Sequence, residues 1–135
     1  MIEDTTEIRI RYGETDRMGY VYYGNYPLFY EVGRTELMRK LGFPYKKLED
    51  MGVMLPVKSL EVDYISPSYY DDLIQIKTTL SLLKGVKVEF RYELFDPKGT
   101  LLNKGKTTLV FVDYKTRKPI RIPEDLLEAV ENYRD

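Results

Sequence analysis

Hydrophobic and polar residues recur with two different periods along this chain. Residues 8–12 alternate between apolar and arginine side chains, which predicts a half-buried strand that ends at Gly13. From about residue 25 to residue 41 the apolar residues recur at steps of three and four, which predicts an amphipathic helix capped by Asn25 and stopped by Gly42. Its apolar stripe consists of Phe29, Tyr30, Gly33, Leu37 and Leu41.

The two-residue period returns after a short helical turn or loop at 44–52. It covers residues 60–64, 74–82, 86–94 and about 101–112, and a last short helix follows Pro123. Asp96-Pro97-Lys98-Gly99 has the residue order of a type I turn and joins the third of these segments to the fourth. Connections this short favour antiparallel pairing.

The order of elements predicts an α+β fold. We expect a five-stranded antiparallel sheet wrapped around one long central helix, with each strand burying one face on that helix. Gly33 costs the helix roughly 1 kcal/mol relative to Ala, so we expect a close approach to another element there. The length fits one domain spanning 1–135. Because the edges of such a sheet can pair with another subunit, we also expect dimerisation.

Composition narrows the function classes. A formal net charge of -1 argues against a broad nucleic-acid-binding surface. No apolar run approaches the roughly 20 residues that span a bilayer. The first ten residues are acidic and do not resemble a signal peptide, so we expect a cytoplasmic protein.

The chain contains neither Cys nor His, which restricts its chemistry. This absence excludes a Ser-His-Asp triad, a Cys nucleophile and the usual thiolate or imidazole zinc site. A magnesium or calcium site made of carboxylates alone stays open, but no EF-hand loop or Gly-rich phosphate loop supports one, so we expect no metal and no cofactor. General acid-base chemistry must come from Asp, Glu, Lys or Tyr.

Asp16 is the main candidate for that chemistry. It lies in a turn-like segment ahead of a run of aromatic residues that leads into the long helix. A carboxylate facing a helix N-terminus can attack, or activate water against, a carbonyl polarised by the free N–H groups of the helix. The competing interpretation is an aspartate that only caps a turn or a helix.

These residues carry a resemblance to a known family. The first third of the chain is similar to the hotdog-fold acyl-CoA thioesterases of the 4-hydroxybenzoyl-CoA thioesterase family, especially the short- and medium-chain acyl-CoA branch associated with the Tol-Pal cluster. A looser match runs from Asp63 to Asp72 and on to the final strand. The residues that carry the specific part are Tyr12, Thr15, Asp16, Gly19, Val21, Tyr22, Tyr23, Asn25 and Tyr26, followed by 29–31 and 34–36.

The resemblance implies an acyl-CoA thioesterase and assigns roles by position. The catalytic carboxylate of the family falls on Asp16, as nucleophile or general base. Backbone N–H groups near Tyr23 and Gly24 would polarise the carbonyl. Many members of the acyl-CoA branch have His at the position of Tyr23, whereas the hydroxybenzoyl branch has Tyr. This departure leaves aliphatic and aromatic acyl groups both open, and the lining of the acyl pocket would come from among Tyr20, Tyr22, Met54 and Tyr64.

Coenzyme A would be part of the substrate, and its phosphates call for basic residues. Family members place phosphate contacts in loops comparable to those of Lys84 and Lys118, which makes both candidate substrate-binding residues. The resemblance also implies a homotetramer built from two dimers. Hotdog dehydratases use a His, which this chain lacks. The alternatives that stay open are an acyl-ACP thioesterase and a non-catalytic hotdog module that binds an acyl thioester or a protein.

Overall fold

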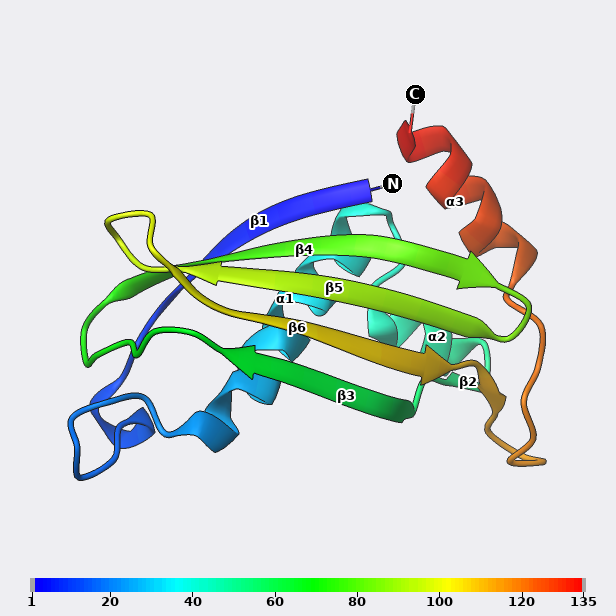
Figure 1. Ribbon diagram of the computed structural model, residues 1–135. Coiled ribbons are helices and arrows are strands. Elements are labelled where there is room, and N and C mark those ends of the chain that lie inside the picture. Colours follow the sequence, from blue (N-terminus) through cyan, green and yellow to red (C-terminus); the bar gives the residue numbers. More distant parts are fainter. Residues whose placement is uncertain (1, 135) are drawn as a thin grey trace.

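A five-stranded antiparallel sheet dominates the computed structural model, which describes residues 2–134 (Figure 1). The strand order is β1-β4-β5-β6-β3. The bounds are Ile2–Arg9 for β1, Val57–Tyr64 for β3, Leu73–Lys84 for β4, Lys87–Phe95 for β5 and Leu101–Val110 for β6. A separate two-stranded pair joins β2, Val53–Met54, to β7, Val112–Asp113. The predicted α+β hotdog architecture is therefore confirmed.

The long helix α1, Tyr26–Lys40, lies across one face of the sheet (Figure 1). Every residue of the predicted apolar stripe is buried. Gly33 explains the close approach: a Cβ at this position would collide with Thr78 Oγ1 and with Ile76 of β4. The helix therefore packs directly on the sheet, as the sequence predicts.

Shorter helices complete the chain. The 3-10 helices η1 and η2 cover Tyr12–Glu14 and Tyr23–Asn25, and η2 runs directly into α1. Helix α2 covers Tyr45–Asp50 and α3 covers Glu124–Arg134. Within residues 2–134, no helix has the length and apolar character needed to cross a bilayer.

Two local expectations at the N-terminal end are wrong. The first strand ends at Arg9, so Tyr12 is not a buried strand residue but starts η1 with its side chain 77% exposed. Asn25 does not cap α1 through its side chain, because its Nδ2 donates to the carbonyl of Glu14 at 2.9 Å. Asn25 therefore ties the start of the helix to η1.

The centre of the core contains two stacked tyrosines. The rings of Tyr30 and Tyr92 are parallel within 2° with centroids 4.3 Å apart. The Tyr30 hydroxyl donates to Asn103 at 2.5 Å, and the Tyr92 hydroxyl shares a 2.6 Å hydrogen bond with Thr107. Both rings are fully buried, and burial raises the pKa of each phenol. These tyrosines are structural.

Strand β3 departs from the predicted pattern. It forms one edge of the sheet, and nearly all of its side chains are exposed, including Val57, Leu60 and Tyr64. The expectation that each strand buries one face on the helix is therefore wrong for this strand, because α1 packs mainly on β1, β4 and β5. One side of β3 is left without a neighbouring strand among residues 2–134.

Candidate functional site

Asp16 begins a tight five-residue turn. Its Oδ1 accepts the backbone N–H groups of Met18 at 2.9 Å and Tyr20 at 3.3 Å. Its backbone N–H donates to the carbonyl of Tyr20 at 2.8 Å, and Gly19 adopts a positive φ of 83° that favours glycine. No hydrogen bond to Oδ2 is found among residues 2–134, so one carboxylate oxygen stays available.

Two neighbouring segments hold this turn in place. Val21 donates its N–H to the carbonyl of Ser68 at 2.8 Å, and Tyr20 forms a bridge with Tyr69. On the other side, the N–H of Tyr22 donates to the carbonyl of Glu14 at 2.9 Å, the same carbonyl that accepts from Asn25. The turn is therefore fixed both to the loop after β3 and to the start of α1.

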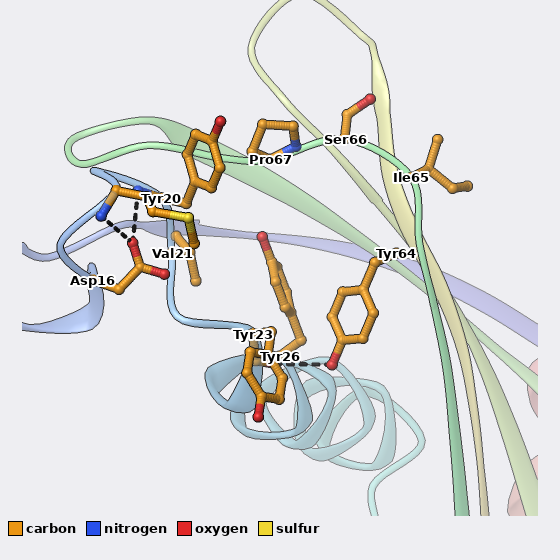
Figure 2. A pocket seen from close by; sticks show the side chains of 10 residues that line it. Asp16, Tyr20, Val21, Tyr23, Tyr26, Tyr64, Ile65, Ser66 and Pro67 are labelled. Carbon is orange, nitrogen blue, oxygen red and sulfur yellow. Dashed lines mark hydrogen bonds between the residues drawn. The ribbon is translucent and has the colours of Figure 1, made fainter.

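Asp16 lies beside a cavity of about 270 Å³. Figure 2 shows its carboxylate on one wall and Tyr64 on the opposite side, with Tyr26 between them. The cavity is lined by Asp16, Met18, Tyr20, Val21, Tyr23, Tyr26, Tyr64, Ile65, Ser66 and Pro67. The Asp16 carboxylate therefore faces a mainly aromatic and apolar space.

The start of the helical segment forms another wall of this cavity. Tyr23 lines it, and its carbonyl accepts the hydroxyl of Tyr64 at 3.0 Å (Figure 2). The first N–H groups of a helix have no acceptor within the helix, and those of Tyr23 and Gly24 occupy that position in η2. Such N–H groups favour a partial negative charge nearby.

The ionisable groups of the lining are Asp16 and four phenols. Burial raises the pKa of Tyr26, more than the opposing hydrogen bond with Ser68 lowers it. Burial and the neighbouring Tyr23 raise the pKa of Tyr64. Both phenols are therefore neutral at physiological pH, and no Lys or Arg among residues 2–134 belongs to the lining.

The predicted site residues fall into two groups. Asp16 and Tyr23 line the same cavity, and Gly24 follows Tyr23 without lining it. Lys84 ends β4, and Lys118 lies in the turn after β7, both at the opposite end of the sheet from the Asp16 turn (Figure 1). Lys84 lines a different hollow, with Arg121. Within one chain, neither lysine is part of the Asp16 cavity.

Part of the lining was not anticipated from the sequence. Tyr20 and Tyr64 line the cavity as considered, whereas Tyr22 does not and Met54 lines a separate hollow beside Tyr114. The residues missed as lining are Met18, Val21, Tyr26 and the loop 65–67. Tyr26 and Pro67 both belong to the motif positions that carry the family resemblance, so a signal for them was present in the sequence.

The donor set for a metal ion is poor. Among residues 2–134, no three Asp, Glu, His or Cys side chains come together in a group that could hold a metal.

Comparisons with known proteins give one consistent result. Residues 10–130 match the model of the thioesterase-like superfamily. The chain is 38% identical over 115 residues to YneP of Bacillus subtilis (strain 168), provisionally named an acyl-CoA thioesterase, covering 85% of this chain and 83% of that protein. It is 32% identical over 120 residues to the acyl-CoA thioester hydrolase YbgC of Escherichia coli O6:H1, and the match covers 89% of this chain and 90% of that protein. A crystal structure of a DHNA-CoA thioesterase from Staphylococcus aureus superposes with a TM-score of 0.93 at 37% identity, covering 99% of this chain and 92% of that one.

Proposed function

Because this chain belongs to the thioesterase-like superfamily, we propose that it hydrolyses the thioester bond of an acyl-CoA, with Asp16 as the reacting carboxylate. The observation that carries the proposal is Oδ2 of Asp16, which accepts no hydrogen bond from residues 2–134 and lies beside the tyrosine-lined cavity at the start of α1. Hydrolysis adds water across the bond between the carbonyl carbon and sulfur, and releases a carboxylic acid and the CoA thiol. The chain supplies no His or Cys that could replace the carboxylate.

Two routes use the same carboxylate. As a general base, Asp16 takes a proton from water while the water oxygen attacks the carbonyl carbon. As a nucleophile, Asp16 attacks that carbon itself, the thiolate leaves, and water then hydrolyses the mixed anhydride. In both routes negative charge develops on the carbonyl oxygen. The N–H groups of Tyr23 and Gly24 are the donors we assign to that oxygen.

Release of the CoA thiol by the purified protein tests the activity. We expect hydrolysis of acyl-CoA, with slower or no hydrolysis of the same acyl group on acyl-carrier protein. A preference for acyl-carrier protein would favour the acyl-ACP alternative. Saturable binding of acyl-CoA without thiol release would identify a non-catalytic module and overturn the proposal.

Oxygen-18 water separates the two routes. In a single turnover, a nucleophilic Asp16 receives one labelled oxygen when water attacks the anhydride at the aspartyl carbon, and mass spectrometry of the peptide containing Asp16 then shows a gain of about 2 Da. If water attacks the acyl carbon instead, repeated turnovers leave the protein unlabelled and rapid quenching is needed to trap the anhydride. No label and no trapped anhydride, with full turnover, favours the general base.

A second copy of the chain is part of the proposal. The free edge of β3 can pair with another strand. A second copy would also bury the exposed apolar side chains on α1 and β3, which are Leu28, Val32, Val57 and Leu60. A two-fold axis beside Leu60 would pair β3 with β3 of the second copy. In this register the two Glu61 side chains do not lie directly opposite each other, which avoids repulsion between like charges. Light scattering should give a dimer, or the tetramer that the family resemblance implies.

This pairing would give the distant lysines access to the site. Antiparallel strands place the start of the partner's β3, and the adjoining β2–β7 pair, beside Tyr64. Lys118, in the turn after β7, would then approach the CoA phosphates from the partner subunit, and Lys84 lies at the same end. Lys118→Ala and Lys84→Ala should raise KM for acyl-CoA. An unchanged KM in both variants would overturn the phosphate assignment.

We place the reaction in the cytoplasm, where acyl-CoA substrates occur, and without a cofactor. The second point is supported by the chemistry, because hydrolysis of a thioester needs only water and a carboxylate. Full activity after dialysis against a chelator is the expected result.

A further inference from the structure

Tyr64 donates a hydrogen bond to the first helical turn beside the Asp16 cavity. Its hydroxyl lies 3.0 Å from the carbonyl oxygen of Tyr23 (Figure 2). The Tyr64 ring meets Tyr23 edge to face, with centroids 6.1 Å apart and planes at 87°, and it meets Tyr26 at 5.8 Å and 58°. These two rings therefore hold the Tyr64 hydroxyl against the start of the helix.

The Tyr23 carbonyl lacks its usual helical donor because of the residue four positions later. In an α-helix this carbonyl would accept the N–H of residue 27, which is Pro and has no N–H. The Tyr64 hydroxyl supplies a donor from a strand 41 residues away in the sequence. Burial and the neighbouring Tyr23 raise the pKa of Tyr64, so the hydroxyl keeps the proton that it donates at physiological pH.

The same peptide group carries one of the proposed oxyanion donors. The carbonyl of Tyr23 and the N–H of Gly24 belong to one peptide bond, and no peptide bond among residues 2–134 is cis. The two groups therefore point in opposite directions, and the Gly24 N–H points away from the Tyr64 hydroxyl. Figure 2 shows Asp16 on the side of the cavity opposite Tyr64. The described part of the chain offers this N–H no acceptor, so it is available to a ligand.

A hydrogen bond to a carbonyl affects the N–H at the other end of the peptide group in two ways. It restrains the rotation of the peptide plane, so the direction of the N–H is fixed before a ligand binds. It also draws electron density towards the carbonyl oxygen, which makes the N–H a stronger donor, since hydrogen bonds in a chain polarise one another. Resting on the proposed function, we propose that Tyr64 is a positioning residue for the reaction, which orients and polarises the Gly24 N–H through the Tyr23–Gly24 peptide group.

Tyr64→Phe removes the hydroxyl and keeps the ring. Tyr64 is 52% exposed, so the fold should tolerate the change. We expect kcat to fall roughly tenfold, less than the fall caused by removing an oxyanion donor completely, because the Gly24 N–H itself remains. KM should not change, because this N–H binds most strongly when negative charge develops on the carbonyl oxygen in the transition state.

Two acyl groups of different shape show where the hydroxyl acts. Because Tyr64 acts on the thioester carbonyl, hexanoyl-CoA and benzoyl-CoA should lose the same factor in kcat in the Tyr64→Phe variant. A loss for one substrate alone would mean that the hydroxyl serves the acyl group, and the inference would be wrong. An unchanged kcat for both substrates would also overturn it.

Tyr92→Phe is the matched control. It also removes a phenol hydroxyl, but the 2.6 Å hydrogen bond that is lost, to Thr107, lies in the buried core and not beside the cavity. We expect Tyr92→Phe to lower Tm and to leave kcat unchanged. If both variants lower kcat to a similar extent, a general loss of stability explains the effect and the inference fails.

The carbonyl stretching frequency of a bound ligand tests the donor itself. The probe is 2-oxoheptyl-CoA with carbon-13 at the carbonyl, a ketone analogue of hexanoyl-CoA in which a methylene group separates the carbonyl from sulfur and prevents hydrolysis. Hydrogen bonding lowers this frequency, so Tyr64→Phe should raise it by several wavenumbers relative to the wild type, whereas Tyr92→Phe should not.

This infrared measurement requires no turnover. A wild-type protein that binds the ketone but releases no thiol from acyl-CoA would refute the proposed function, and the frequency would still test the inference about Tyr64. An equal frequency in the wild type and in Tyr64→Phe would contradict the inference, and it would leave the proposed function intact if the wild type hydrolyses acyl-CoA.

Discussion

Two aspartates of this chain begin turns of the same geometry. Asp16 Oδ1 accepts N–H groups two and four residues later at 2.9 and 3.3 Å, and Asp96 Oδ1 does the same at 2.9 and 2.9 Å. In both turns a glycine three residues on has a positive φ, 83° for Gly19 and 86° for Gly99. Both turns also close with a backbone hydrogen bond from the aspartate N–H, at 2.8 and 3.0 Å.

The surroundings separate the two turns. Asp96 connects β5 to β6 in a simple hairpin. Asp16 instead faces four tyrosines and lies near the start of a 15-residue helix. Local structure alone therefore supports the turn-capping interpretation for both residues. What gives Asp16 a chemical role in our account is the cavity that other segments build around it.

The glycines of the two turns should separate stability from activity. No heavy atom of the described residues lies within 4 Å of a Cβ built at Gly19 or Gly99, so alanine causes no collision at either position. The cost in both variants is therefore the positive φ alone, about 1–2 kcal/mol. Thermal unfolding should show the same fall in Tm for Gly19→Ala and for Gly99→Ala. Gly19→Ala alone should also lower kcat, by roughly 10²-fold, because small displacements of a reacting group are costly. Equal kcat in the two variants would mean that the position of Asp16 does not limit turnover.

Gly24→Ala tests the part of the site that has no counterpart near Asp96. A Cβ there would lie 2.5 Å from Cε2 of Tyr22, so the exposed Tyr22 ring must move. Tyr23 packs against that ring, with 4.8 Å between the two ring centroids, and would be displaced with it. We expect kcat/KM to fall roughly tenfold. This fall is smaller than the one caused by removing an oxyanion donor completely, because the backbone N–H groups remain. Gly13→Ala is the control, since nothing lies within 4 Å of its Cβ. Its activity should match the wild type.

Alanine at the two aspartates should cost similar stability. Asp16→Ala and Asp96→Ala each remove one carboxylate oxygen that accepts two backbone N–H groups. Each loss should lower the free energy of unfolding by about 1 kcal/mol in urea titrations. A much larger cost at Asp16 would indicate a structural role beyond the turn and would weaken the comparison.

Alkaline pH should affect the tyrosine-lined end of the molecule gradually. Burial raises the pKa of Tyr26 above the ordinary phenol value of 10.0. A pKa that is raised in the folded state gives stability that is complete below the unfolded value and is lost as pH rises through the folded value. The free energy of unfolding should therefore be level up to about pH 10 and decline above it. Tyr26→Phe should make that decline shallower, as urea titrations at several pH values can measure.

The regular elements and the turn that Asp16 begins ahead of the long helix could be predicted from the sequence, because periodicity and turn residues act locally. The helix boundaries differ by one residue at each end from the predicted 25–41. The walls of the cavity could not be derived in this way, since Tyr26 and Ser68 meet across 42 residues of sequence. The exposure of β3 was missed for a related reason: alternation shows which residues share a face, but not whether anything covers that face.

The activity of Asp16→Asn against that of Asp96→Asn tests the central claim most directly. Asn keeps a side-chain oxygen that can accept the same N–H groups, so both proteins should fold and unfold like the wild type. We predict that Asp16→Asn lowers kcat for acyl-CoA hydrolysis by roughly 10³-fold, within the range of acid-base contributions, while Asp96→Asn stays within about twofold of the wild type. A folded Asp16→Asn protein with wild-type kcat would contradict the account.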